Sequence, residues 1–224
     1  MYSEKIKVLD HGFVRLIDSM GNDLSVVSAA RVSYAESWKA GEDEGSDARL
    51  IKYLKKNKHH TPFEAVTLKF EVKAPIFVFR QWHRHRTWTY NELSARYREL
   101  PEEIYMPDFR AQSKINKQGS DGMIDQVMAV EMHNAFLASY QMAFAAYREA
   151  LRLGVAKEIA RSVLPVATYS HMEATVNLLN LMRFLALRNH SHAQYEIRVY
   201  AEAMLELART VAPVSIAAFE EFGA

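Results

Sequence analysis

The stretch at residues 68–73 limits the choice of fold most strongly, because its apolar and charged residues alternate strictly. A period of two predicts a strand that buries one face and exposes the other. Pro75 ends this strand and suits the first turn of a helix over residues 76–85. No strand-and-helix unit then repeats along the chain, which argues against a parallel dinucleotide-binding sheet.

Two further strands and a series of helices are expected. Residues 6–17 alternate around the turn signal His11-Gly12 and predict a strand or short hairpin, and residues 168–176 predict another strand. Apolar residues three or four apart predict helices, the longest of them between Gly122 and Gly154. The other expected helices cover residues 24–31, 48–56, 156–164, 178–188 and 192–211.

Local signals refine these boundaries. Asp23 and Asp47 are expected to cap the helices at 24–31 and 48–56, and Thr61 and Glu64 have the spacing of a capping box. Residues 99–122 hold two Pro and two Gly among polar residues and predict a long surface loop. We therefore expect a helix-rich α+β fold with a small, mostly antiparallel sheet, built as one compact unit over residues 1–224.

The composition excludes several kinds of site. The chain has 28 Lys and Arg against 27 Asp and Glu, so no overall field attracts a polyanion or an anionic membrane. It has no cysteine, which removes disulfides, thiolate metal ligands and a cysteine nucleophile. No apolar run suits a membrane span or a signal peptide, and a cytoplasmic location is the expectation. Without a glycine-rich phosphate loop, side chains and helix ends would have to hold any nucleotide.

Residues 80–98 concentrate basic and aromatic side chains, with five Arg, two Trp, two Tyr, two His and a single acid, Glu92. Arginine forks suit phosphate or an imide edge, and aromatic faces can stack on a base or a flavin ring. The same composition fits a single-stranded nucleic-acid binding module, in which Trp82, Trp88 and Tyr90 stack on bases while arginines follow the phosphates. It also fits a solvated basic face at the end of a helix.

Other polar residues carry weaker signals. Ser94 lacks the surroundings of a nucleophile elbow and is expected to donate a hydrogen bond. Glu92 fits an anchor for a ring N–H or a sugar hydroxyl as well as it fits a surface ion pair with Arg96. Three histidine pairs have a spacing seen in metal sites, but no thiol or HExxH motif accompanies them and no metal is expected. The pairs are His83 with His85, His59 with His60, and His190 with His192.

Arg161, Arg183 and Arg188 interrupt apolar helical stretches farther along the chain. An arginine that points inward requires a carboxylate, a phosphate or a polar substrate edge as its partner. An arginine whose side chain reaches out to solvent requires no such partner. Three such arginines, together with those of residues 80–98, favour an anion site.

The motif Arg84-His85-Arg86, followed after seven residues by Ser94 within RHRTWTYNELSARY, resembles the signature of the flavin-dependent thymidylate synthases. Blocks at residues 21–34, 59–82, 158–170 and 187–198 resemble further family segments in order and spacing, so the resemblance covers nearly the whole chain. It implies a helix-rich α+β fold and a homotetramer in which several subunits build each flavin site.

The resemblance also implies a reaction. In this reaction 5,10-methylenetetrahydrofolate gives a one-carbon unit to dUMP. FAD that has been reduced by NADPH supplies the hydride. The products are dTMP and tetrahydrofolate. Conventional thymidylate synthases attack the uracil ring with a cysteine thiolate, and this chain has no cysteine. In the family an arginine polarises the pyrimidine at its imide edge instead. The matching position here is Arg188.

Two overlapping sets of ligand contacts follow from the resemblance. The positions that match dUMP contacts are Gln81, Arg84, Glu92, Ser94, Ala95, Arg96, Arg161 and Arg188. The positions that match FAD contacts are Ser33, His59, Thr61, Glu64, Arg84, His85, Arg86, Glu92 and Asn177. Since Arg84 and Glu92 belong to both sets, they are expected between the two ligands.

The chain departs from the family pattern at the expected adenosine end of FAD. Many members read Asn-x-Arg where this chain has Asn177 followed two residues later by Leu179, and Arg183 stands where Asn or His is frequent. Positions four apart on a helix share a face. We therefore expect Arg183 to replace the missing guanidinium and to contact FAD.

Overall fold

A computed structural model describes residues 3–223, so the ends of the expected unit, residues 1–2 and 224, lie outside the described chain. The strands are β1 (Ile6–Val8), β2 (Gly12–Met20), β3 (Thr67–Pro75), β4 (Thr89–Glu92), β5 (Arg110–Gln112), β6 (Ser120–Met123) and β7 (Tyr169–Asn177). The α-helices are α1 (Asp23–Arg31), α2 (Glu44–Lys56), α3 (Ile76–Trp82), α4 (Gln126–Arg152), α5 (Lys157–Ala160), α6 (Leu178–Arg188), α7 (Tyr195–Val211) and α8 (Pro213–Phe222). The short 3-10 helices are η1 (Val32–Tyr34), η2 (Ser37–Lys39), η3 (Thr61–Ala65) and η4 (Arg161–Val163).

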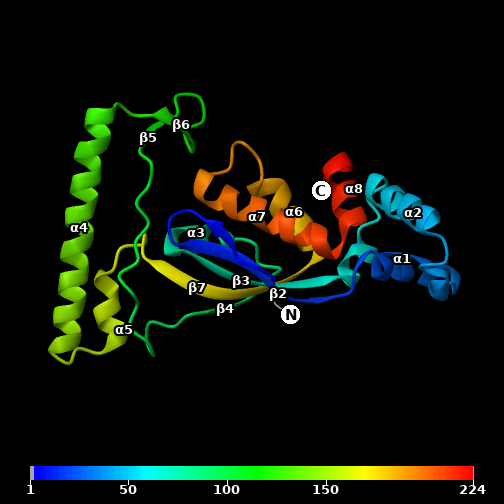
Figure 1. The fold of residues 1–224 in the computed structure, drawn as a ribbon, viewed down its shortest axis with the longest axis horizontal. Coiled ribbons are helices and arrows are strands. Elements are labelled where there is room, and N and C mark those ends of the chain that lie inside the picture. The colour runs from blue at the N-terminus through cyan, green and yellow to red at the C-terminus, as the bar shows by residue number, and fades with distance from the viewer. Residues whose placement is uncertain (1–2, 224) are drawn as a thin grey trace.

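An antiparallel sheet in the order β1-β2-β3-β7-β4 forms the centre of the molecule. Helices α3, α6 and α7 cover one side of it, and α1, α2 and α8 pack together at one end (Figure 1). At the other end stand α4 and α5, away from the sheet (Figure 1). The predicted helix-rich α+β class with a small antiparallel sheet is therefore confirmed.

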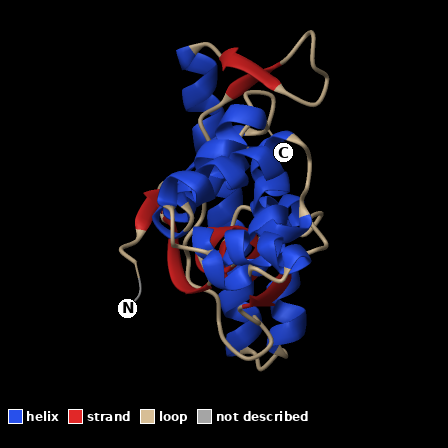
Figure 2. Ribbon diagram, turned by 90° about the vertical axis from the view of Figure 1, so that its right-hand side faces the viewer, coloured by secondary structure: helices blue, strands red, loops and turns tan. Residues whose placement is uncertain are grey.

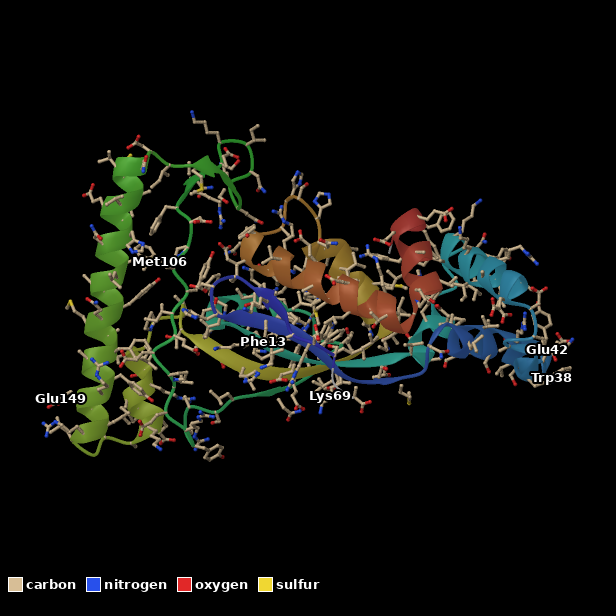
Figure 3. All side chains as sticks on the ribbon, in the orientation of Figure 1. Phe13, Trp38, Glu42, Lys69, Met106 and Glu149 are labelled. Carbon is tan, nitrogen blue, oxygen red and sulfur yellow. The ribbon has the colours of Figure 1, made fainter. Side chains whose placement is uncertain are left out.

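The alternation at residues 68–73 gives β3 its two faces. Leu68, Phe70 and Val72 are fully buried beneath the helices. Lys69 lies on the opposite side of the sheet (Figure 3), where it pairs with Glu173 of β7. All nine residues of β3 pair with β7, so these two strands form the middle of the sheet. The predicted strands at 68–73 and 168–176 are both confirmed.

The predicted hairpin near the N-terminus is also confirmed, as β1 and β2. Gly12 begins β2 where α7 crosses the sheet, and a Cβ atom there would come 2.1 Å from the Tyr200 hydroxyl. That hydroxyl donates to the backbone oxygen of Lys73, at 2.8 Å. Glycine is therefore required by the close approach of α7, because no side chain fits between the helix and the strand.

The long helix α4 is confirmed, but its packing is uneven. Only near its C-terminal end do side chains become buried, where Phe144 and Tyr147 form a small second core with Ala160. Val127, near the start of α4, is 76% exposed, and Met142, just before the buried Phe144, is 74% exposed. The amphipathic pattern of α4 is thus mostly unmatched within a single described chain.

The loop predicted at residues 99–122 is more structured than expected. It contains strand β5 and the start of β6, which pair as an antiparallel hairpin that projects beyond the helices (Figure 2). Ile104 also forms an isolated bridge with Thr168 beside the central sheet. The polar composition of β5 and β6 gave no sequence signal for a strand, because these strands pair without burying alternate residues.

The capping predictions for Asp23 and Asp47 are wrong. Asn22 caps α1 by accepting from the Leu24 backbone N–H, at 2.9 Å, whereas Asp23 accepts from the backbone N–H groups at the start of α8. Helix α2 begins earlier, capped by Asp43. Asp47 lies inside it, buried in an ion pair with Arg31 at 2.7 Å. Both aspartates joined tertiary contacts that local spacing does not reveal.

Two further local predictions need correction. No side-chain cap forms at η3, so the expected capping box of Thr61 and Glu64 is absent. The helix predicted over 76–85 ends at Trp82, and Tyr90 donates its hydroxyl hydrogen towards the backbone oxygens of Trp82 and His85. This phenol satisfies carbonyls that a longer helix would have used. The predicted helix at 192–211 likewise begins only at residue 195.

Candidate active site

The first candidate site lies where the C-terminal ends of α3 and α6 meet, and we call it the arginine–histidine cluster: Gln81, Arg84, His85 and Arg188. Arg188 donates from Nε to His85 Nε2 at 3.0 Å and from Nη2 to the Gln81 backbone oxygen at 3.5 Å. These contacts join positions about a hundred residues apart. The predicted activating residue therefore lies beside the Arg-His-Arg motif.

Burial sets the charge state of this cluster. Burial, helped by the Arg188 charge, lowers the pKa of His85 to about 4, so its imidazole is neutral near pH 7 and can accept from Arg188. Burial and then the charge of Arg84 lower the pKa of Arg188 below its ordinary value. Within residues 3–223 Arg188 forms no ion pair with a carboxylate. Its positive charge is thus oriented and left without a counterion.

A chain of hydrogen bonds connects Gln81 to the buried Glu196. Gln81 donates to Gln194, which donates to Glu196 at 2.8 Å. Glu196 is only 1% exposed, and it also pairs with Arg110 and accepts from the Tyr105 hydroxyl at 3.0 Å. Burial acts to raise the pKa of Glu196, but the bonds from Arg110 and Gln194 outweigh it and lower the pKa. Glu196 therefore remains a carboxylate that orders its neighbours.

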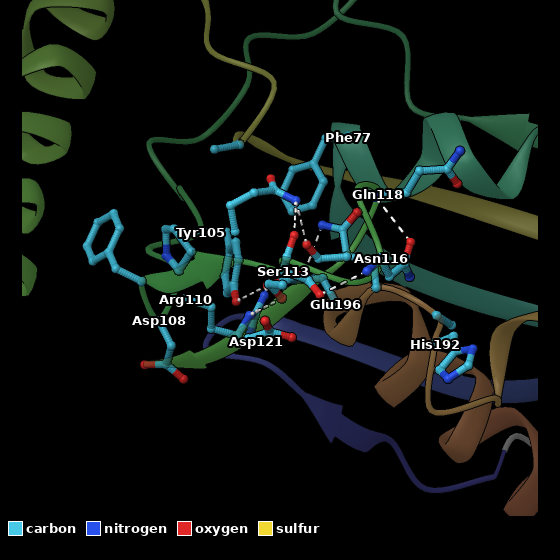
Figure 4. Close-up of a pocket in the computed structure, with 18 of the residues that line it drawn as sticks. Phe77, Tyr105, Asp108, Arg110, Ser113, Asn116, Gln118, Asp121, His192 and Glu196 are labelled. Atoms are coloured by element: carbon cyan, nitrogen blue, oxygen red, sulfur yellow. Dashed lines mark hydrogen bonds and ion pairs between the residues drawn. The ribbon is translucent and has the colours of Figure 1, made fainter. Parts of the chain in front are cut away.

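This support lines a cavity of about 820 Å³ between the β5–β6 hairpin and the start of α7. Figure 4 shows Tyr105, Arg110 and Glu196 converging on one wall of it. None of the predicted ligand contacts lines this cavity. Sequence reasoning missed Glu196, whose only signal is an acid within the apolar face of α7.

The second candidate site, which we call the loop cluster, consists of Glu92, Ser94, Ala95, Arg96 and Arg161. Glu92, Ala95 and Arg161 line a separate cavity of about 680 Å³. Glu92 accepts from the Ser170 hydroxyl at 2.7 Å, and Arg96 pairs with Glu158, another lining residue, at 3.2 Å. The alternative ion pair between Glu92 and Arg96 does not form.

The two other polar members of the loop cluster are Ser94 and Arg161. The Ser94 hydroxyl accepts from the Arg96 backbone N–H at 3.3 Å, which shapes the turn after β4. Arg161 begins η4 and is exposed. The predicted anion site therefore has an open half built mainly on loops and short helices.

Helix α3 separates the two clusters. Arg80 and His83, three residues apart, line the cavity of the loop cluster, whereas Arg188 contacts the Gln81 backbone oxygen and the side chain of His85, which follows the end of α3. Positions three or four apart lie on the same side of a helix. The predicted dUMP contacts are consequently brought together in two groups on different faces of α3.

The remaining predicted FAD contacts lie near the start of α6. Ser33, His59, Thr61 and Glu64 are exposed on η1 and around η3, which packs against α1 and α6. The Asn177 side chain caps α6 by accepting from the Asn180 N–H at 2.9 Å. Arg183 is exposed and donates to Asn180 Oδ1 at 3.1 Å.

Helix α6 links this group to the arginine–histidine cluster. Its 11 residues carry Asn177 before its first turn and Arg188 at its last. At 1.5 Å per residue the two ends are about 16 Å apart. Arg84 and Arg86 are exposed near the far end. Apart from Glu92, which lies in the loop cluster, the predicted FAD contacts therefore fall into two groups along one helix.

Trp82, Trp88 and Tyr90, the expected stacking residues of the 80–98 segment, do not form an open base-stacking surface. Trp82 is fully buried and Trp88 is 5% exposed, and both rings pack against Phe184 in the core. Tyr90 stacks on Trp88, with ring centroids 6.2 Å apart. A single-stranded nucleic-acid module would need these faces open to solvent. Their burial is inconsistent with that alternative.

The buried Lys55 on α2 escaped the sequence analysis, and His60 beside η3 was considered there only as half of a histidine pair. The Lys55 Nζ and His60 Nδ1 atoms are buried, and neither has a hydrogen-bond partner among the described residues. Lys55 follows Ile51 by four positions and therefore lies on the apolar face of α2. That spacing was the available signal, but the run of lysines suggested only a helix end.

Nothing in residues 3–223 gathers three or more His, Asp or Glu side chains in a way that could hold a metal ion. The predicted histidine pairs have other neighbours. His59 packs edge-on against Tyr53, His83 packs against Tyr90, and His190 packs against His192. In the same described part of the chain, no helix is long and apolar enough to cross a membrane.

Known sequences resemble this chain over almost its whole length. The family model described as thymidylate synthase complementing protein matches residues 15–214. A flavin-dependent thymidylate synthase of Thermus thermophilus is 50% identical over 218 residues, which cover 96% of this chain and 78% of that protein. One of Treponema denticola is 45% identical over 224 residues, covering 97% of this chain and 82% of that protein.

A solved structure resembles the fold as closely. The UMP/dUMP methylase PolB of Streptomyces cacaoi, in a crystal structure bound with 5-Br dUMP, has a TM-score of 0.86 and 41% identity. The match covers 97% of this chain and 98% of that one. A second structure of PolB, bound with 5-Br UMP, has the same TM-score and identity.

Proposed function

Because the chain belongs to the thymidylate synthase complementing protein family, which includes the flavin-dependent thymidylate synthases, we propose that it converts dUMP to dTMP by reductive methylation. The family prediction is confirmed, and the protein is an enzyme of this family. We propose 5,10-methylenetetrahydrofolate as the carbon donor and NADPH as the reductant of FAD. The observation that carries the proposal is the half-buried Arg188 guanidinium without a carboxylate partner, beside the Arg-His-Arg motif.

Arg188 is the residue that we propose to activate the pyrimidine. Neutral His85 and the Gln81 backbone oxygen accept two of its N–H groups and fix the plane of the guanidinium. A positive charge held in a half-buried position stabilises the negative charge that develops on the uracil imide as it loses the N3 proton. This role needs no cysteine nucleophile, in agreement with the composition.

The residues near the start of α6 fit FAD in charge and exposure. Thr61, Glu64 and Asn177 offer polar groups at an accessible edge, and the unpaired Lys55 Nζ supplies a positive charge beneath it. We propose that these residues, with Ser33, His59 and Arg183, hold one end of FAD. His85, Arg86, Arg84 and Glu92 would contact the other end. When bound, the reduced flavin supplies the hydride that completes the methyl group.

We propose that a second copy of the chain completes each site. Support comes from the two clusters, which face different sides of α3 although both match dUMP contacts. The apolar residues exposed along α4 provide a surface that self-association would bury. A homotetramer with shared sites, as the resemblance implies, satisfies both observations.

The reaction is tested with the purified protein loaded with FAD and reduced without oxygen. After dUMP and 5,10-methylenetetrahydrofolate are added, we expect the flavin absorption band to return and dTMP to form in equal amount. Omission of either substrate is the control, and the band should then stay bleached. A flavin that remains reduced in the complete mixture, with no dTMP, would refute the proposal.

The shared site is tested by complementation between two inactive variants. Arg188→Ala damages the arginine–histidine cluster and Arg161→Ala the loop cluster. Co-expressed with different affinity tags, the mixed assembly contains sites with both clusters intact and should regain dTMP formation. The matched control pairs Arg188→Ala with Arg84→Ala, which damage the same cluster and should not complement. If neither pair regains activity, each site lies within one chain.

UMP is a second candidate substrate, since PolB is described as a UMP/dUMP methylase and was solved with analogues of both nucleotides. Glu92, which keeps one carboxylate oxygen outside its bond to Ser170, is a suitable acceptor for a sugar hydroxyl. Initial rates with dUMP and UMP at equal concentrations decide between them. A faster rate with UMP would make the ribonucleotide the substrate.

A further inference from the structure

Lys55 is the most unusual charged residue outside the two clusters. Its side chain is 3% exposed, and its Nζ has no hydrogen-bond partner among residues 3–223. The rings of Phe63 and Phe219 face this ammonium group, with centroids 5.9 Å and 5.7 Å from Nζ. An ammonium group buried without an acceptor destabilises a fold, so its presence calls for a compensating ligand.

Arg183 on α6 adds a second positive charge near Lys55. Burial, followed by the charge of Arg183, lowers the pKa of Lys55, and burial followed by the charges of Lys55 and Arg183 lowers that of His60. The buried His60 Nδ1 has no partner, and Arg183 bonds only to the neutral amide oxygen of Asn180. No described carboxylate forms an ion pair with Lys55 or Arg183. A corner with this much uncompensated positive charge fits an anion.

We propose that Lys55, His60 and Arg183 form an anion site that binds the diphosphate of FAD. The inference rests on the proposed function and assigns residues that the family resemblance did not single out, apart from Arg183. Exposed Arg183 would offer its planar fork to the phosphate oxygens, while Lys55 adds a charge from a medium of low dielectric beneath them. Binding would give His60 an acceptor as well.

The position of this anion site selects FAD over the nucleotide substrate. His60 directly precedes η3, and Arg183 lies on α6 six residues after its cap, Asn177. These elements carry the FAD contacts that are farthest from Arg188. Leu179 is 2% exposed and packed in the core, so position 179 brings no charge to the ligand. The positive charge is instead supplied from α2 by Lys55 and from the next turn of α6 by Arg183.

The test compares Lys55→Met with Lys56→Met, which removes the same charge from an exposed neighbouring position on α2. FAD affinity is measured by quenching of flavin fluorescence on binding to the apoprotein. We expect Lys55→Met to weaken FAD binding at least about tenfold, because the phosphates lose a positive charge held in a medium of low dielectric. Lys56→Met should bind FAD as the wild type does.

A second readout separates ligand binding from folding. Removal of a buried, unpaired charge should leave the FAD-free Lys55→Met protein as stable as the wild type or more stable, while the rise in melting temperature caused by FAD should shrink. Arg183→Gln, at an exposed position, should also weaken FAD binding and keeps the test open if Lys55→Met does not fold. Weaker FAD binding accompanied by an equal loss of FAD-free stability would overturn the proposal.

Wild-type FAD affinity in both Lys55→Met and Arg183→Gln would also overturn the anion site, and it would leave the proposed reaction untouched. The converse is equally distinguishable. If Lys55→Met binds FAD more weakly than the wild type, but the wild type forms no methylated nucleotide, the reaction would be refuted and the anion site supported.

Discussion

The two clusters of predicted dUMP contacts differ in how they are held. The arginine–histidine cluster rests on half-buried groups and one buried carboxylate: Arg188 bonds to a neutral His85, and Gln81 bonds through exposed Gln194 to buried Glu196. The loop cluster contains exposed arginines, and its one ion pair, between Arg96 and Glu158, is also exposed. One half of the proposed site is thus pre-oriented by the fold, and the other is open.

The difference between the two clusters suggests which of them binds the substrate and which activates it. A charge held by buried neighbours needs little reorganisation when negative charge develops on a substrate, which favours catalysis. An exposed arginine loses side-chain freedom on binding and is screened by water, so it contributes mainly to affinity. We therefore expect changes in the first cluster to alter the fold or kcat, and changes in the second to alter KM.

The largest effect is expected from Glu196→Ala, which strips Arg110, Tyr105 and Gln194 of a buried partner. Removing one side of a buried ion pair costs roughly 3–5 kcal/mol of unfolding free energy. Urea denaturation measures it, with Glu202→Ala, an exposed position on α7, as the control. A loss below about 1 kcal/mol would show that the first cluster is not supported from behind.

Arg188→Ala should be next in size. Loss of a pre-oriented positive group at the reacting ring is expected to lower kcat by about 100-fold to 1,000-fold. The variant should still bind FAD, as measured by its flavin fluorescence. Arg152→Ala, on the exposed end of α4, provides the control for removal of an arginine. An unchanged kcat in Arg188→Ala would place activation elsewhere.

The pH dependence of stability should follow His85. Its folded pKa of about 4 lies below the ordinary histidine pKa of 6.5, so the unfolded chain binds more protons between these values. Stability should therefore be fully present above about pH 6.5 and fall as the pH drops towards 4. His85→Gln should show a shallower fall in melting temperature over this window. His60, whose pKa is also lowered, contributes the same slope to both proteins.

Arg96→Gln should have the smallest effect on the fold. Its ion pair with Glu158 is about half exposed on both sides, so the free energy of unfolding should change by less than about 1 kcal/mol. The KM for dUMP should nevertheless rise, because the loop cluster loses a phosphate-binding fork. If KM stays constant while kcat falls, the division between binding and activation is wrong.

Much of the fold was predictable because it depends on local periodicity. Alternation located β3 and β7, and apolar spacing located α4, α6 and α7, since both patterns record which face is buried. The capping predictions failed for a different reason. Asp23 and Asp47 have local spacing typical of caps, but distant backbone and Arg31 compete for their oxygens. Strand β4 escaped notice because its pairing partner, β7, lies some eighty residues away.

The sequence by itself determined the family, because its motifs match family segments in order and spacing. It also determined which residue types are available for chemistry, and above all that cysteine is absent. Only the tertiary structure decided which of those residues meet. It joined Arg188 to His85, divided the dUMP contacts between two faces of α3, and buried Lys55 beside Arg183. The physical reason is that charge state and partnership depend on burial and on contacts between distant segments, and a one-dimensional pattern records neither.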